Sequence, residues 1–101
     1  MATVQEFFER LPTAVDPAKT AGMNNSFVFD VQGVGAWTVR VADGTVTVAE
    51  GAEAADCTIS ASEDTLTRIV NGDQNATTAY MTGKLKIAGD MGAALKLQKL
   101  F

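Results

Sequence analysis

The sequence predicts an α+β fold, a five-stranded and mainly antiparallel sheet with helices packed on one face. Five short segments alternate apolar and polar residues with the period of a β-strand, and the segments around them repeat apolar residues at helical spacing. Each strand segment has only one apolar side, whereas a sheet buried on both faces would show continuous apolar runs. The helices should therefore cover one face, and the 101 residues should form a single domain, residues 1–101.

The first helix is predicted from Val4 to Leu11. Thr3 can cap this helix, and Glu6 three residues later completes a capping box. Apolar residues recur at helical spacing along the segment, and we expect Pro12 to end it. Residues 13–25 should then form a loop with room for one short turn.

Three strands are predicted next, at residues 26–31, 36–41 and 45–48. Their alternate residues form one apolar face: Phe27, Phe29, Val31, Trp37, Val39, Val41, Val46 and Val48. Asp43-Gly44 between the second and third strands is a strong hairpin signal. A two-residue loop at this point pairs Val41 with Val46, and so places the valines on the same face.

The turn between the first two strands is predicted to be a three-residue loop, residues 33–35. This loop would pair Val31 with Trp37 and Phe29 with Val39. Both registers keep the apolar residues together, which favours a meander with one apolar and one polar face.

The second half of the chain continues with strands and helices in alternation. We expect a strand at residues 56–61, helices at 63–70 and 76–82, a strand at 84–88 and a last helix at 91–101. Ser62 and Asp90 precede two of these helices and are suitable N-caps, because their side-chain oxygens can accept hydrogen bonds from the first turn.

Several kinds of chemistry are absent from this sequence. The chain has no histidine, which removes Ser-His and Cys-His nucleophile pairs and most transition-metal sites. Cys57 lies on the apolar side of its strand, so we expect a buried structural thiol. Gly83-Lys84 lacks the first glycine and the final Ser or Thr of a phosphate-binding loop. We therefore expect no enzyme activity, no cofactor and no metal.

Charge and hydropathy limit the kinds of partner that this chain can bind. The net charge is −4, which disfavours nucleic-acid binding and leaves at most transient contact with a membrane surface. No apolar run approaches the roughly 20 residues that span a bilayer. The N-terminal residues resemble neither a signal peptide nor a transit peptide, and the single cysteine is compatible with a reducing compartment. We expect a cytoplasmic protein.

The C-terminal segment holds more apolar residues than one packing stripe needs. Residues 91–101 alone include seven Met, Ala, Leu or Phe residues. Two interpretations of this surplus stay open. The side chains either fill the core of a small domain or line a cavity between sheet and helices.

Three segments together resemble the sterol carrier protein family, whose members are non-specific lipid-transfer domains, in its stand-alone bacterial form. They are FVFDVQGVGAWTVRVADG, ADCTISASEDTLTRIVNG and AYMTGKLKIAGDMGAALKLQKLF, and they extend over most of the chain. The last is the most specific, because Gly-Lys-Leu-Lys-Ile-x-Gly-Asp followed by a Lys-Leu tail is typical of the family. The terminal KLF differs from a Ser-Lys-Leu peroxisomal address.

The resemblance implies a five-stranded sheet covered by helices, with a hydrophobic tunnel between the two layers. It also implies non-catalytic binding or transfer of a fatty acid, a fatty acyl-CoA or a sterol-like lipid, by a monomer or a homodimer. Apolar side chains from both layers would line the tunnel. The candidates are Phe29, Trp37, Val39, Ile59, Leu66, Val70, Tyr80, Met81, Leu85, Ile87, Met91, Leu95 and Phe101.

Two further questions stay open from the sequence. Lys84 and Lys86 are most simply on the solvated side of the last strand, and the alternative places one of them at the tunnel mouth beside a carboxylate or phosphate. The alternative function is a protein-interaction or regulatory subunit, which would use the same apolar surface to dock on a partner.

Overall fold

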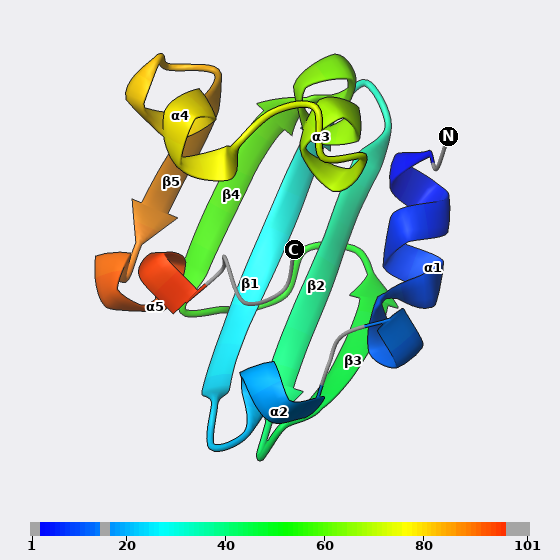
Figure 1. The fold of residues 1–101 in the computed structure, drawn as a ribbon, viewed down its shortest axis with the longest axis vertical. Helices are drawn as coiled ribbons and strands as arrows, with labels where there is room; N and C mark the ends of the chain where they lie inside the picture. The colour runs from blue at the N-terminus through cyan, green and yellow to red at the C-terminus, as the bar shows by residue number, and fades with distance from the viewer. Residues whose placement is uncertain (1–2, 15–16, 97–101) are drawn as a thin grey trace.

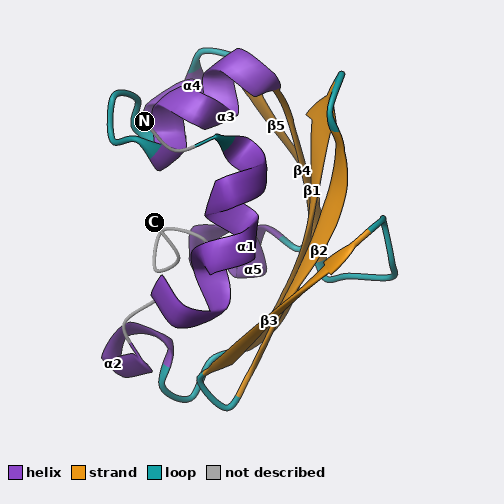
Figure 2. Ribbon diagram, turned by 90° about the vertical axis from the view of Figure 1, so that its right-hand side faces the viewer, coloured by secondary structure: helices purple, strands orange, loops and turns teal. Residues whose placement is uncertain are grey.

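The computed structural model describes residues 3–14 and 17–96 as one layer of helices on one five-stranded sheet. The elements in chain order are α1 (Val4–Ala14), α2 (Pro17–Thr20), β1 (Asn24–Gln32), β2 (Gly35–Ala42), β3 (Thr45–Glu50), β4 (Cys57–Ser62), α3 (Glu63–Val70), α4 (Ala76–Met81), β5 (Leu85–Gly89) and α5 (Met91–Lys96). Figures 1 and 2 show all the helices on the same side of the sheet. The predicted fold class and element order are confirmed.

The strands are ordered β3-β2-β1-β4-β5. Three of the four pairings are antiparallel, and the central pairing of β1 with β4 is parallel. After β3, at one edge of the sheet, the chain must therefore pass β2 and β1 before it can begin β4. Residues 51–56 make this crossing without a helix.

The hairpin between β2 and β3 has the predicted register. Val41 pairs with Val46, and Asp43 and Gly44 have positive φ angles of 50° and 83°. Two consecutive positive φ angles are typical of a type I′ turn, which Asp-Gly favours. The dipeptide therefore sets the register locally.

The register between β1 and β2 differs from the prediction by two residues. Trp37 pairs with Phe29, and Val39 pairs with Phe27. The turn is centred one residue earlier than predicted, because Val31 pairs with Gly35, the Val34 N–H donates to the Val31 carbonyl at 3.1 Å, and Gly33 adopts a positive φ of 83°. A shift of two residues leaves every side chain on the same face, so Trp37 still points to the helices.

Helix α1 begins as predicted and ends later. The Glu6 N–H donates to Thr3 Oγ1 at 3.1 Å, which confirms Thr3 as the cap. The helix continues past Pro12 to Ala14, so the prediction that Pro12 ends it was wrong. Leu11 is 1% exposed and holds the last turn on the sheet, and Thr13 Oγ1 donates to the Arg10 carbonyl at 3.1 Å.

The predicted caps of the later helices are confirmed. The Thr65 N–H donates to Ser62 Oγ at the start of α3, and the N–H groups of Gly92 and Ala93 donate to Asp90 Oδ1 at the start of α5. The structure describes α5 as far as Lys96, so the predicted extension to Phe101 lies outside the described residues.

The outer face of the sheet is partly covered, which the alternating pattern alone did not predict. The crossing segment, residues 51–56, lies on the face opposite the helices (Figure 2). Thr38 Oγ1 donates to the Gly51 carbonyl at 2.8 Å and accepts from the Glu53 N–H at 3.1 Å. Thr38 and Val28 are 1% and 4% exposed although both point away from the helices. The two faces are therefore closed in different ways, one by helices and one by this segment.

The crossing segment ends against the end of β5. The Asp90 N–H donates to the Asp56 carbonyl at 2.9 Å. A Cβ atom on Gly89 would lie 2.6 Å from the Asp56 carbonyl oxygen, and Gly89 has a φ of +107°. Only glycine fits this contact without strain.

We predict that Gly89→Ala destabilises the fold strongly. The substitution adds both the strain of a positive φ, about 1–3 kcal/mol, and a backbone clash. Gly51→Ala is the matched control, because Gly51 has a similar φ of +98° and nothing within 4 Å of its Cβ position. Urea unfolding should show that Gly89→Ala loses at least about 2 kcal/mol more than Gly51→Ala. Equal losses would contradict the tight contact with Asp56.

Candidate functional site

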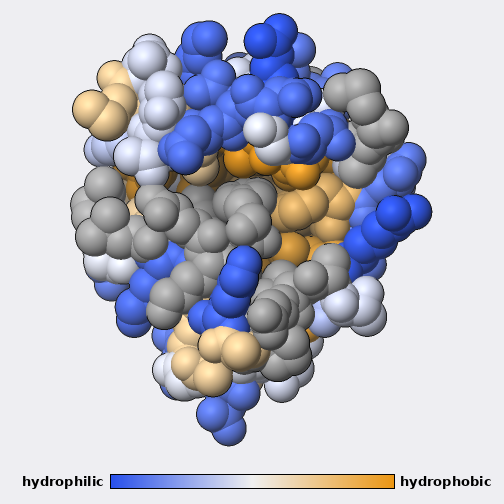
Figure 3. Space-filling view, in the orientation of Figure 1, coloured by the Kyte–Doolittle hydropathy of each residue, from blue (hydrophilic) through white to orange (hydrophobic). Residues whose placement is uncertain are grey.

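The helix-facing side of the sheet is a continuous apolar surface. Alternate residues of β1, β2 and β4 and the first residue of β5 are at most 7% exposed on this side: Phe27, Phe29, Val31, Trp37, Val39, Val41, Cys57, Ile59, Ala61 and Leu85. In Figure 3, apolar atoms are visible in a hollow at the middle of this side, between the hydrophilic residues above α3 and those near α1. We call these ten residues the inner face.

Phe8 connects α1 to the inner face. Its ring stacks on Trp37 with a centroid distance of 4.7 Å and an interplanar angle of 16°, and it lies 5.1 Å from the ring of Phe29. Phe7 adds an edge contact to Phe8 at 5.3 Å. Such pairs contribute about 0.5–1.5 kcal/mol beyond the area they bury. The aromatic contacts therefore fix α1 above β2.

The structure brings together most of the candidate residues that the sequence analysis selected. Six are buried in the layer between sheet and helices: Phe29, Trp37, Val39, Ile59, Leu66 and Leu85. Val70 and Ile87 are half-buried and pack against this core. Met91 and Leu95 belong to α5, but their side chains, like all of Phe101, lie outside what the structure describes.

Two candidates lie apart from this layer. Tyr80 and Met81 are 42% and 78% exposed on α4. The helix has six residues, and it contacts the interior through Ala79, which is fully buried, and Ala76, which is half-buried against the core. Since successive helix residues are about 100° apart, the two residues after Ala79 turn toward solvent.

The sequence analysis did not select Phe8 and Leu11 as site residues, although it placed them on the apolar side of the first helix. Both are 1% exposed. The signal was present in their helical spacing, but this pattern does not say which strand a helix will cover. The structure places α1 above β2 and β3.

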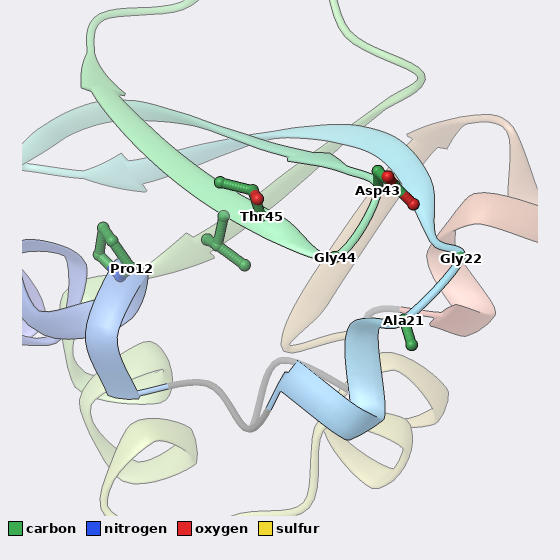
Figure 4. Close-up of a pocket in the computed structure, with 7 residues that line it drawn as sticks. Pro12, Ala21, Gly22, Asp43, Gly44 and Thr45 are labelled. Carbon is green, nitrogen blue, oxygen red and sulfur yellow. The ribbon is translucent and has the colours of Figure 1, made fainter.

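Two hollows flank the last turn of α1. One, of about 150 Å³, lies beside Phe8, Trp37 and Val48. The other, of about 420 Å³, lies between Pro12, the Ala21-Gly22 turn and the β2–β3 hairpin, with buried Val46 among its lining residues (Figure 4). Pro12 borders both. Each hollow reaches inward-facing residues of the sheet from the side of α1.

Cys57 is a buried thiol whose surroundings disfavour reactivity. The thiol is 1% exposed, and burial, with the charges of Asp56 and Asp90, raises its pKa from 9.0 to about 11. The neutral thiol therefore predominates at physiological pH, which does not favour a nucleophile. Within residues 3–14 and 17–96, no three His, Cys, Asp or Glu residues are grouped to hold a metal. Every helix in these same ranges is too short or too polar to cross a membrane.

A known family matches nearly the whole sequence of the chain. Residues 4–101 match the SCP-2 sterol transfer family. The chain belongs to this family. The resemblance predicted from the sequence is thereby confirmed, and membership supports lipid binding or transfer as the general class of function.

Individual relatives agree with the family assignment. The chain is 45% identical over 65 residues to sterol carrier protein 2 of Gallus gallus. The aligned segment covers 63% of this chain and 12% of that protein. It is 34% identical over 101 residues to hydroxysteroid dehydrogenase-like protein 2 of Xenopus tropicalis, which covers 96% of this chain and 24% of that protein. The chain thus spans between about an eighth and a quarter of these relatives.

Solved structures show the same fold. The apo form of sterol carrier protein 2 from Yarrowia lipolytica superposes with a TM-score of 0.77 at 21% identity, over 94% of this chain and 86% of that one. A palmitated sterol carrier protein 2-like protein from Aedes aegypti gives a TM-score of 0.76 at 22% identity, over 95% and 91%. At these identities the likeness establishes the fold.

We predict that Cys57 is alkylated slowly in the native protein. A pKa raised by about two units leaves roughly 100-fold less thiolate at pH 8 than in the unfolded chain. Iodoacetamide labelling followed by mass spectrometry should show at least this difference between native protein and protein in urea. Because the pKa of Cys57 is raised in the folded protein, the contribution of this thiol to the free energy of unfolding also depends on pH. It is fully present below about pH 9 and is lost as the pH rises through about 11. Equal labelling rates would contradict the buried position.

Proposed function

We propose that residues 1–101 act as one lipid-binding domain that holds the hydrocarbon part of a ligand in a tunnel between the sheet and the helices. The ligand is a fatty acid, a fatty acyl-CoA or a sterol-like lipid, and the domain carries it without chemical change. The observation that supports this most is the inner face, which is apolar across four strands and is met by Phe8 from α1. A ligand of this kind needs such a surface and few polar groups.

Family membership and one relative add support. The family is described by sterol transfer, and the Aedes aegypti relative with the same fold is palmitated. We propose the same use of the fold here, with Phe29, Trp37, Val39, Ile59, Leu66 and Leu85 in contact with the ligand. Val70 and Ile87 would close its sides.

We propose that the ligand reaches this layer beside α1. The hollow next to Trp37 and the larger one next to Val46 lie on either side of Pro12. Helix α1 buries the side chains of Val4, Phe8 and Leu11, so a hydrocarbon chain can replace contacts between side chains without breaking a strand pairing. This route keeps the backbone hydrogen bonds of the sheet intact.

Simple energetics give the expected affinity. About 14 buried methylenes contribute roughly 11 kcal/mol, at about 0.8 kcal/mol each. Association costs at least about 4 kcal/mol, which leaves about 7 kcal/mol and a Kd on the order of 10 μM. A shorter chain should bind more weakly in steps of about fourfold per methylene.

We predict that filling the hollow beside Trp37 weakens lipid binding. Val48→Phe adds a ring to a half-buried residue of this hollow and should lower the affinity for palmitate about tenfold, because overpacking opposes the ligand. Displacement of a fluorescent fatty-acid probe measures the affinity.

In the unchanged protein, emission of the buried Trp37 should be blue-shifted and should change on saturation with palmitate.

Val34→Phe is the control for this substitution. Val34 is 41% exposed at the β1–β2 turn, so the same change there should leave affinity within about twofold. No lipid response of Trp37, together with a homodimer free of lipid in native mass spectrometry, would instead favour the protein-docking alternative. Unchanged affinity in Val48→Phe would place the access route elsewhere.

We predict no turnover of acyl-CoA thioesters or fatty-acid esters. The chain has no histidine, and its single thiol is buried with a raised pKa, so neither a general base of the common type nor an activated nucleophile is available. A thiol-release assay with palmitoyl-CoA should remain at the rate without protein. Saturable hydrolysis that survives repurification and Cys57→Ala would contradict this proposal.

A further inference from the structure

The outer face of the sheet carries a polar pocket that the lipid proposal does not use. The pocket has a volume of about 310 Å³, at the lower end of the range of ligand sites, and Lys84, Lys86, Ser60 and Ser62 are among its lining residues. Side chains alternate along β4 and β5, so Ser60 and Lys86 point away from the helices while Ile59 and Leu85 point toward them. Most of the polar lining residues therefore lie on the face opposite the lipid layer, while Ala61 of the inner face and Thr65 of α3 also border the pocket.

The strand pairing brings its polar groups together. Ser60 pairs directly with Lys86 across β4 and β5, and Gln32 pairs with Ser62 across β1 and β4. In an antiparallel pair such as β4 with β5, directly opposed residues have Cβ atoms about 4.5–5.5 Å apart. Lys84 is two residues before Lys86 and lies on the same side, so both ammonium groups can reach one ligand.

These cations are free to bind an anion. Within the described part of the chain, the ion pairs are Arg40 with Glu53 and Arg68 with Asp64, and neither Lys84 nor Lys86 takes part in one. Both lysines are exposed, so their ammonium groups are accessible to a ligand from solvent.

Hydroxyl groups add donors to the same pocket. Thr65 is only 9% exposed and lines the pocket, and its Oγ1 accepts from Ser62 Oγ at 3.0 Å. Among the hydrogen bonds of the described residues, none uses the Thr65 hydroxyl proton as a donor to another group. The Ser60 hydroxyl likewise makes no hydrogen bond in this part of the chain. The pocket thus offers ammonium and hydroxyl donors, which is the combination that phosphate oxygens accept.

Nearby carboxylates do not occupy the pocket. Asp30 pairs with Ser60 across β1 and β4 and points to the same face as Ser60, and Glu63 and Asp64 begin α3, but none of the three lines the pocket. Asp64 is held by Arg68 at 3.2 Å.

We propose that this outer pocket binds a phosphate monoester or pyrophosphate group through Lys84 and Lys86, with Ser60 and Thr65 as hydroxyl donors. The group belongs either to a soluble ligand or to a lipid headgroup at a membrane surface. The inference does not depend on lipid binding by the inner face, because none of these four donor residues is among those proposed to contact the lipid.

Titration of ¹⁵N-labelled protein with inorganic pyrophosphate at low salt tests the soluble source. We expect saturable shifts of the Ser60, Ser62, Lys84 and Lys86 amides, and a loss of affinity of at least about tenfold in the Lys84→Ala/Lys86→Ala double variant. Lys19→Ala/Lys96→Ala is the matched control, since it removes the same charge from exposed residues outside the pocket. The control should keep the affinity of the unchanged protein within about twofold.

Flotation with phosphatidylcholine vesicles, with and without phosphatidic acid, tests the headgroup source. Binding that needs phosphatidic acid and is lost only in the Lys84→Ala/Lys86→Ala variant supports the proposal with a membrane source, even if pyrophosphate does not bind. Equal losses in both double variants, or no saturable response to either probe, overturn it. Palmitate affinity should be the same in both double variants and the unchanged protein, so this experiment separates failure of the phosphate site from failure of the lipid site.

Discussion

The contact of Phe8 with Trp37 and Phe29 is the interaction on which the helix-facing half of the molecule depends. It fixes α1 above the sheet through one stacked pair at 4.7 Å and one tilted pair at 5.1 Å. The strands hold Trp37 and Phe29 as direct neighbours across β1 and β2, so the register of this hairpin creates the surface that Phe8 contacts. The register of β1 and β2 therefore also determines where α1 packs on the sheet.

A second constraint acts from the other side of the sheet. The crossing segment, residues 51–56, binds Thr38 and Arg40 on the outer face and ends at the contact between Asp56 and Gly89. It connects an edge strand to a central one without a helix, so all helices remain available for the inner face. The result is a sheet with an apolar side that faces the helices and a polar side where, among the described residues, Lys84 and Lys86 form no ion pair.

Local signals predicted the parts of the fold that depend on neighbouring residues. Asp43-Gly44 determined its hairpin register, and the capping oxygens of Ser62 and Asp90 marked the starts of α3 and α5. The β1–β2 register was not determined by its pattern, because a two-residue shift keeps the same side chains inside. The end of α1 was also missed, because the helix continues through Pro12 to Ala14, with the buried Leu11 in its last turn.

The site was less predictable than the fold, for two physical reasons. Apolar periodicity identifies the residues that leave water but not the element that they meet. The candidates therefore did not include Phe8, which stacks on Trp37, and did include Tyr80 and Met81, which are exposed on α4. The covered outer face depends on the non-local path of residues 51–56, which no local pattern encodes. The pairing of Ser60 with Lys86 likewise appears only when β4 and β5 are placed side by side.

The central claim is that a hydrocarbon chain lies against the inner face. Isotope-filtered nuclear Overhauser spectroscopy of the protein with ¹³C-labelled palmitate measures this directly. The account predicts contacts from the chain methylenes to the rings of Phe29 and Trp37, and none to Val28, which points to the opposite side. Contacts only to Tyr80 and Met81 on the surface of α4, or to Val28, would contradict it.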